Sequence, residues 1–165
     1  NLKGLKEGMY KTWFYNGNIN SKGRYIKDKK EGIWSYYHLN GEVASKLYFK
    51  NNELIKTLIF NELGNKTNVE LIKNQKAKFE GGIDQFQKKV KKLANNIDYK
   101  IKGNVFVDFI IDIDGSIKNV NVDVKLPKRL EKQIVTFFQN IKGWTPTIHM
   151  NRKIPMIYNL PLNFN

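Results

Sequence analysis

The residues that could do chemistry are few and scattered along the chain. There is no cysteine, which excludes disulfides, thiolate metal sites and cysteine nucleophiles. The two histidines, His38 and His149, stand apart, so each is better explained as a satisfied or solvent-exposed side chain than as a ligand. Ser116 has no histidine near it in sequence to activate it. Phosphate loops, nucleophile elbows and paired carboxylates cannot be found either. We therefore expect no enzyme.

One acidic motif, Asp112-Ile113-Asp114-Gly115, is similar to part of a calcium loop. Such a loop needs an oxygen ligand at its first position and a bidentate glutamate at its last. Here Ile110 takes the first position and Asn121 takes the last. We reject calcium, interpret the motif as a turn and expect neither a metal nor another cofactor.

Composition and charge describe a soluble, basic protein. The chain has 165 residues, 41% of them hydrophobic, and a formal net charge of +14. Its longest apolar stretches, such as residues 109–111, fall far short of the ~18–20 residues that a membrane-spanning helix needs. The basic residues are spread over both halves, which is typical of a generally basic surface rather than of one nucleic-acid stripe. Acidic partners, anionic polymers and phospholipid surfaces all fit this charge.

The start of the chain has no initiator methionine and no signal peptide, and it lies inside a repeat. We therefore expect a trimmed chain, whose export signal or inner-membrane anchor lies upstream.

The first part of the chain is a repeat. Residues 7–17 align without gaps on residues 31–41, which gives a period of 24 residues (31 − 7), and a weaker third copy covers residues 58–65. Each clear copy has an Asn-Gly pair between aromatic segments, which predicts a hairpin with a type I′ turn. Residues 28–32 are expected to form the turn that joins one hairpin to the next. Alternation would place Trp34 and Tyr36 on one face of a sheet, and Ile33 and Tyr37 on the other.

One such hairpin cannot bury its own apolar face, so the copies must stack. The second copy resembles the MORN-like repeat, a scaffold or interaction module, in all its pattern positions: Gly32, Trp34, Tyr36, Tyr37, Asn40 and Gly41. The first copy departs from the pattern, with Tyr10 at the tryptophan position. The aromatic residues are interpreted as the core of the repeats; the alternative is an exposed aromatic ladder for a glycan or a peptide.

After a polar stretch the pattern changes to a single α+β unit. We expect repeats over residues 1–65, a linker over 66–75 and a second domain over 76–165. Periodicity predicts helix, strand, strand, helix and strand, in that order. The apolar stripes are Ile83, Phe86, Val90 and Leu93; Val105, Val107, Phe109, Ile111 and Ile113; Val120, Val122, Val124 and Leu126; Leu130, Ile134, Phe137, Phe138 and Ile141, after Pro127; and Met156, Tyr158, Leu160, Leu162 and Phe164.

This order resembles the C-terminal domain of TonB energy transducers. The matching motifs are Phe79-Glu80-Gly81-Gly82, Gly103-x-Val105-x-Val107-x-Phe109, Asp112-x-Asp114-Gly115-x-Ile117, Trp144-x-Pro146 and Leu160-Pro161-Leu162-x-Phe164. The resemblance implies an α+β fold with two helices on a three-stranded antiparallel sheet, here preceded by an all-β array of aromatic hairpin repeats. Two departures stand out. The family's Tyr-Pro after the first helix is absent from residues 95–99, and residues 151–155 replace its Gly-Lys-Pro order.

What the resemblance implies is a periplasmic, non-enzymatic domain that binds an extended segment, the TonB box, of an outer-membrane transporter. The last strand would pair with that segment, and motor proteins of the inner membrane would act through a part outside this chain. The first departure touches the segment that lies near the partner peptide in the family, so it affects the partner more than the fold. The expected binding residues are Ile97, Asp98, Tyr99, Ile154, Met156, Ile157, Tyr158, Asn159, Leu160 and Leu162.

The prolines of the last strand support the same mode without the family. Pro155 and Pro161 cannot donate to a ladder, so this strand should lie at an edge or have a locally free side. A free edge is a template for strand addition, although a second copy of the chain or the repeats could cover it instead.

Alternative functions remain open. The chain could be a passive adaptor of the cell envelope, or a protein that binds an anionic polymer, either nucleic acid or the acidic glycan mesh with its peptidoglycan, through the aromatic repeats and the basic surface. Because the lysines lie on outer faces, where charge is usually solvated, we do not expect nucleic acid.

Overall fold

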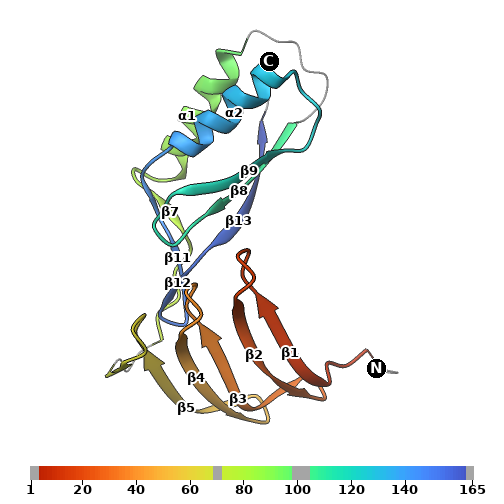
Figure 1. Cartoon of the computed structure of the whole chain (residues 1–165), viewed down its shortest axis with the longest axis vertical. Helices are drawn as coiled ribbons and strands as arrows, with labels where there is room; N and C mark the ends of the chain where they lie inside the picture. Colours follow the sequence, from red (N-terminus) through yellow and green to blue (C-terminus); the bar gives the residue numbers. More distant parts are fainter. Residues whose placement is uncertain (1–3, 69–71, 98–104, 163–165) are drawn as a thin grey trace. The chain divides into compact units, whose positions relative to one another are not determined.

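A computed structural model describes residues 4–68, 72–97 and 105–162 (Figure 1). The chain divides into two compact units. The repeat unit consists of Asn1–Asn74 with His149–Lys153, and the C-terminal unit of Gln75–Ile148 with Ile154–Asn165. None of the helices in the described part of the chain is long and apolar enough to cross a membrane.

The repeat unit is built on a six-stranded antiparallel sheet in which the strands follow one another in chain order. One 24-residue copy supplies two strands, so the sheet grows by adding copies side by side, as stacking requires. The strands are β1 (Gly8–Trp13), β2 (Ile19–Ile26), β3 (Lys29–Tyr37), β4 (Val43–Lys50), β5 (Glu53–Phe60) and β6 (Lys66–Thr67).

The turns of this sheet differ from the prediction in their types. Gly17 and Gly41 have positive φ, but the asparagines before them do not, so the Asn-Gly pairs do not form type I′ turns. Their loops are wider: the N–H of Gly17 donates to the carbonyl of Phe14 at 3.1 Å, inside a bond from Phe14 N–H to the Asn18 carbonyl at 2.8 Å. The third copy repeats this closure at residues 61–65.

The two-residue turns with positive φ at both positions are instead Lys27-Asp28, with φ of 48° and 65°, and Asn51-Asn52, with φ of 50° and 73°. These are the values expected of type I′ turns. The predicted turn over residues 28–32 is therefore wrong, because β3 already begins at residue 29.

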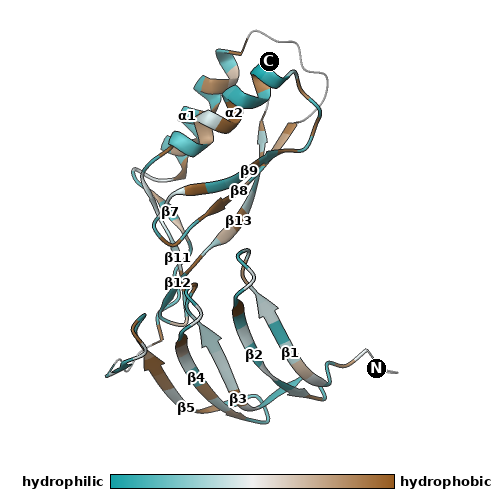
Figure 2. Cartoon of the chain, in the orientation of Figure 1, coloured by the Kyte–Doolittle hydropathy of each residue, from teal (hydrophilic) through white to brown (hydrophobic). Residues whose placement is uncertain are grey.

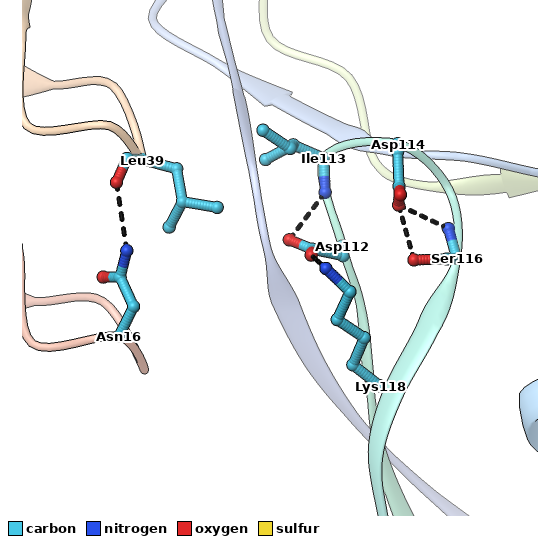
Figure 3. A network of polar contacts seen from close by, with 7 residues as sticks. All are labelled: Asn16, Leu39, Asp112, Ile113, Asp114, Ser116 and Lys118. Atoms are coloured by element: carbon cyan, nitrogen blue, oxygen red, sulfur yellow. Dashed lines mark hydrogen bonds and ion pairs between the residues drawn. The ribbon is translucent and has the colours of Figure 1, made fainter.

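Polar side chains bond to the backbone of the turns, within one copy or in the next, and these bonds repeat with the 24-residue period. A Glu7 carboxylate oxygen accepts from the N–H of Lys27 at 2.8 Å. Its counterpart Glu31 accepts from the N–H of Asn51 at 2.7 Å. Asn16 donates to the carbonyl of Leu39 at 3.1 Å (Figure 3), and Asn40 donates to that of Glu62 at 3.0 Å. The turns of neighbouring copies are thus joined to one another.

One face of this sheet, the inner face, forms a small aromatic core. Trp34, Tyr36 and Leu47 are its fully buried members, which confirms that Trp34 and Tyr36 share a face. Ile33 points the other way and is 51% exposed. Gly23 lies under Trp34, where an added Cβ would be 2.1 Å from the indole, so only glycine fits at that position.

The C-terminal unit has two helices and a three-stranded antiparallel sheet of order β13-β8-β9, in agreement with the expected fold class. Short strands add a β7–β10 pair and a β11–β12 hairpin, whose residues 149–153 belong to the repeat unit. The elements are β7 (Lys78–Phe79), α1 (Ile83–Asn95), β8 (Val105–Ile111), β9 (Ile117–Val122), α2 (Lys128–Asn140), β10 (Trp144–Thr145), β11 (Thr147–His149), β12 (Arg152–Ile154) and β13 (Met156–Leu162).

The helices are amphipathic, and each buries one stripe against the sheet. Polar and apolar residues alternate along both ribbons (Figure 2). The core combines buried residues of α1, β8, α2 and β10 with Leu162 of β13: Phe86, Val90, Leu93, Val105, Val107, Phe109, Ile111, Leu130, Ile134, Phe138, Trp144 and Leu162.

Four residues of the predicted stripes are placed differently. Ile83, at the first position of α1, is 54% exposed. Ile113 lies in the turn after β8. Because β9 ends at Val122, Val124 and Leu126 lie beyond the strand, although both still pack against the core. Helix and strand ends are set by caps and turns, which periodicity does not register.

Candidate functional site

The candidate site is the outer edge of β13. In the sheet order β13-β8-β9, β13 has a single hydrogen-bonded neighbour, β8, among the residues that the structure describes. Its register runs without a bulge from Met156 opposite Ile111 to Leu162 opposite Val105. The expectation of an edge strand is thereby confirmed for Pro161, whereas Pro155 lies just outside β13.

The bonding of β8 decides which backbone groups of β13 face outward. Both the N–H and the carbonyl of Phe106 bond to Asp123, on the β9 side, at 2.7 and 3.1 Å. Backbone groups alternate sides along a strand, so those of Val105 and Val107 face β13. Their partners Leu162 and Leu160 face back toward β8.

The intervening residues of β13, which are Ile157, Asn159 and Pro161, therefore direct their backbone groups away from the sheet. The nitrogen of Pro161, which carries no hydrogen, falls on this outward side, so the proline removes no bond to β8. The edge offers two N–H groups and three carbonyls in an extended row.

The side chains of β13 divide between two faces. Tyr158 stacks on Phe109 with ring centroids 5.9 Å apart and an interplanar angle of 18°. Leu160 also packs against the core, on the same face. On the other face Asn159 donates from Nδ2 to Asp108 at 2.7 Å, and Ile157 is 71% exposed. The strand is thus anchored on one face and presents an apolar side chain on the other.

A groove of about 460 Å³ runs beside the end of this strand. Leu160 and Pro161 form one wall, and Val90, Ala94 and Asn95 of α1 belong to the other. Val90 and Ala94 are buried while Asn95 is exposed, so the groove has an apolar floor and a polar rim.

The predicted binding residues do not all come together. Ile97 is half-buried and packs against the core just after α1. Ile154 is 9% exposed and belongs to β12, separated from β13 by Pro155. Asp98 and Tyr99 lie outside the described residues, as does Phe164. The predicted residues in β13 are Met156, Ile157, Tyr158, Asn159, Leu160 and Leu162.

The acidic turn between β8 and β9 holds the sheet in place. Asp114 accepts from the N–H and the hydroxyl of Ser116 at 2.8 and 2.6 Å, and these bonds lower the pKa of its carboxyl group (Figure 3). Buried Asp112 forms an ion pair with Lys118. Among the described residues no group of three or more potential ligand side chains could hold a metal ion. These contacts give the turn a structural role.

Sequence reasoning missed Arg152, which is 2% exposed in the repeat unit. Its guanidinium group donates to the carbonyl of Tyr37 and, at 2.6 Å, to Asn20, and lies 5.4 Å from the ring centres of Phe14 and Tyr36. Burial lowers its pKa to about 10. An arginine in a short polar turn carries no sequence signal of such a role.

Fold and edge together define a small α+β unit with an edge strand that is unpaired on one side among the described residues. Residues 94–165 match the family model described as the Gram-negative bacterial TonB protein C-terminal. The match confirms the resemblance for that segment. The matched family consists of non-enzymatic protein-interaction domains that are periplasmic in Gram-negative bacteria. The MORN-like assignment of the repeats is not confirmed by a family match. Comparisons with curated proteins and with solved structures found no match.

Proposed function

We propose that the C-terminal unit captures an extended segment of an outer-membrane transporter, the TonB box, by adding it as a strand beside β13. The observation that carries the proposal is the outward row of backbone groups on β13. The family match over residues 94–165 supports the choice of partner. In this proposal the protein works in the periplasm as part of an energy transducer, held by an inner-membrane anchor and driven by motor proteins there.

Backbone pairing would supply the affinity, and side chains would supply the choice of segment. Asn159 and Ile157 can each exchange two bonds with an incoming strand, whereas Pro161 can only accept. Ile157, 71% exposed, offers an apolar contact on one face. On the other face, the groove beside Pro161 can hold a side chain of the segment. A second copy of this chain could occupy the same edge and would compete with the transporter segment.

The proposal is tested by introducing a proline at the centre of the outer edge of β13. Asn159→Pro removes an outward N–H group and leaves the backbone bonds to β8 in place, so we expect binding of a transporter N-terminal peptide to fall below detection. Asn159→Ala keeps the N–H group and loses only the side-chain bond to Asp108. It should change affinity by less than about fivefold, or ~1 kcal/mol.

Binding is measured by calorimetry on the full chain and mapped by amide chemical shifts. Near-ultraviolet circular dichroism must first show that both variants keep the native packing of Trp144 and Tyr158. Shifts that cluster around Trp13 and Trp34, with none on β13, would place the peptide on the repeats and refute the proposal. Equal binding by the proline and alanine variants would do the same.

A further inference from the structure

The second face of the repeat sheet, the outer face, is not used by the proposed function. It is defined here by Met9, Lys11, Trp13, Lys22, Arg24, Ile33, Lys46 and Tyr48, which alternate along their strands with residues of the inner face. Three of its apolar members are well exposed: Met9 at 67%, Trp13 at 59% and Ile33 at 51%.

The inner face, in contrast, is covered from within the same unit. Met150 and Ile72 pack on its aromatic core, and Arg152 lies against Tyr36. The inner face of the sheet is therefore covered, whereas the outer face is exposed.

Lysines line up across the strands of the outer face. Lys11 lies directly opposite Lys22, Lys22 opposite Ser35, and Ser35 opposite Lys46. Since neighbouring strands are ~4.8 Å apart, three ammonium groups share one row about 15 Å long. Like charges directly opposite each other destabilise a sheet, so the Lys11–Lys22 pair costs stability unless an anion lies between them.

The carboxylates of the repeats do not neutralise this row. Glu7 and Glu31 accept backbone hydrogen bonds from the turns at residues 27 and 51, and Asp28 accepts from the N–H of Lys6. Among the described residues no ion pair joins a carboxylate to Lys11, Lys22 or Lys46. Glu7, Glu31 and Asp28 are thus engaged with backbone groups, and Lys11, Lys22 and Lys46 lie in the middle of their strands.

Aromatic rings accompany the basic groups. The ammonium group of Lys22 lies 5.4 Å from the ring centre of Tyr37, and that of Lys56 lies 5.8 Å from the ring centre of Tyr48. Trp13 stands beside the row with its ring open to solvent. The cation–π contact holds Lys22 of the row against the sheet, which reduces the entropy that this side chain loses when it binds an anion.

We propose that the outer face binds a linear anionic polysaccharide, with its carboxylate or phosphate groups on the lysine row and a sugar ring on Trp13. Charge complementarity requires a polyanion, because three unneutralised lysines share one row. A folded protein partner fits less well, since interface cores are apolar. Here Lys11 separates Met9 from Trp13, and Arg24 lies opposite Met9, so these two exposed apolar side chains do not form a continuous patch.

The experiment uses the full chain and three probes of equal length: an oligogalacturonate, a neutral malto-oligosaccharide and poly-glutamate. We expect calorimetry at low salt to detect oligogalacturonate binding and no malto-oligosaccharide binding. The triple variant Lys11→Gln/Lys22→Gln/Lys46→Gln should bind the oligogalacturonate about tenfold more weakly. Trp13→Ala should also weaken it, whereas poly-glutamate, which cannot stack a sugar on Trp13, should bind more weakly than the oligogalacturonate.

A matched triple, Lys88→Gln/Lys89→Gln/Lys92→Gln, removes the same charge from the exposed side of α1. Equal loss of binding in both triples would show unspecific attraction to net charge and overturn the proposal. Poly-glutamate binding as tight as that of the oligogalacturonate would overturn the choice of a polysaccharide. Titration of the transporter peptide into the outer-face triple should be unchanged, so failure here is distinguishable from failure at β13.

Discussion

The two units build antiparallel sheets in opposite ways. The repeat sheet is wide, and among the described residues its inner face has a small buried cluster, Trp34, Tyr36 and Leu47. The C-terminal sheet has three strands and a core to which both helices contribute. The repeat sheet is also held by polar bonds to its turns, such as that from the N–H of Asn51 to Glu31, whereas the C-terminal sheet depends on apolar burial.

Because the two sheets are built differently, a different part of each sheet remains exposed. Repeats extend sideways, so every strand from β2 to β5 is paired on both sides, and the uncovered outer face remains for binding. The C-terminal sheet has one face covered by helices, so its edge remains for binding. We accordingly place the two proposed sites on a face in the first unit and on an edge in the second.

The largest expected effect comes from cutting the chain after residue 75. We propose that residues 76–165 fold alone, because the whole helical core lies within residues 79–162. Residues 1–75 should lose their fixed aromatic packing, because they lack Met150 and Arg152, which cover the inner face. Near-ultraviolet circular dichroism and thermal unfolding of the fragments check both expectations.

Aggregation of the 76–165 fragment, or a lack of cooperative unfolding, would refute the boundary that we propose. A native-like signal from Trp34 in the 1–75 fragment would show that residues 149–153 contribute little to the repeat unit.

The next largest difference is expected between two glycine substitutions, one in each unit. Gly115 and Gly17 both have positive φ, of 81° and 87°, so alanine is strained at each by about 1–2 kcal/mol. At Gly115 an added Cβ would also be 2.1 Å from the backbone oxygen of Trp144, whereas nothing lies within 4 Å at Gly17. We expect Gly115→Ala to cost more than about 4 kcal/mol and Gly17→Ala about 1–2 kcal/mol in urea unfolding. Equal costs would mean that the backbone at Trp144 can move.

Much of this arrangement is predictable from the sequence, because period and alternation directly report which residues face a core. The 24-residue repeat, both helices and β8 follow from such patterns. The edge position of β13 follows from Pro161, whose missing hydrogen requires an unpaired side.

The parts that could not be predicted depend on long-range contacts. Asn16 and Asn40 suit a type I′ turn by residue type, yet each donates to a carbonyl of the next copy instead. The partners of Arg152, Tyr37 and Asn20, lie 115 and 132 residues away in the chain. Local alternation cannot show that Ile154, predicted here as a binding residue, belongs to β12, because a single residue, Pro155, separates that strand from β13.

Two tryptophan substitutions, one in each unit, should also differ in their cost to the free energy of unfolding. Trp144 is 8% exposed and packs on Phe79 and Phe86 at ring distances of 5.1 and 5.0 Å. Trp144→Ala should cost ~3–5 kcal/mol of unfolding free energy. Trp13, 59% exposed, should cost less than about 1 kcal/mol when changed to alanine. Urea titration followed by circular dichroism measures both; a small loss at Trp144 would mean that a ligand, and not the core, requires it.

The smallest expected effect is a pH dependence confined to the repeat unit. His149 is partly buried beside Tyr36, with ring centroids 5.9 Å apart. Burial lowers the pKa of its imidazole, and the charges of Arg152 and Lys30 lower it further. The unfolded chain, in which the pKa is about 6.5, therefore binds this proton more readily than the folded chain. The stabilisation is fully present above about pH 6.5 and is lost as the pH falls through the folded-state pKa.

His149→Gln cannot be protonated and should remove this part of the pH dependence, so its thermal stability should fall less than that of the native chain between about pH 7.5 and pH 5. Lys30→Gln should reduce the slope partially, because it removes the weaker of the two repelling charges while leaving Arg152 in place. Identical slopes in the native chain and in His149→Gln would show that the imidazolium is accommodated without cost.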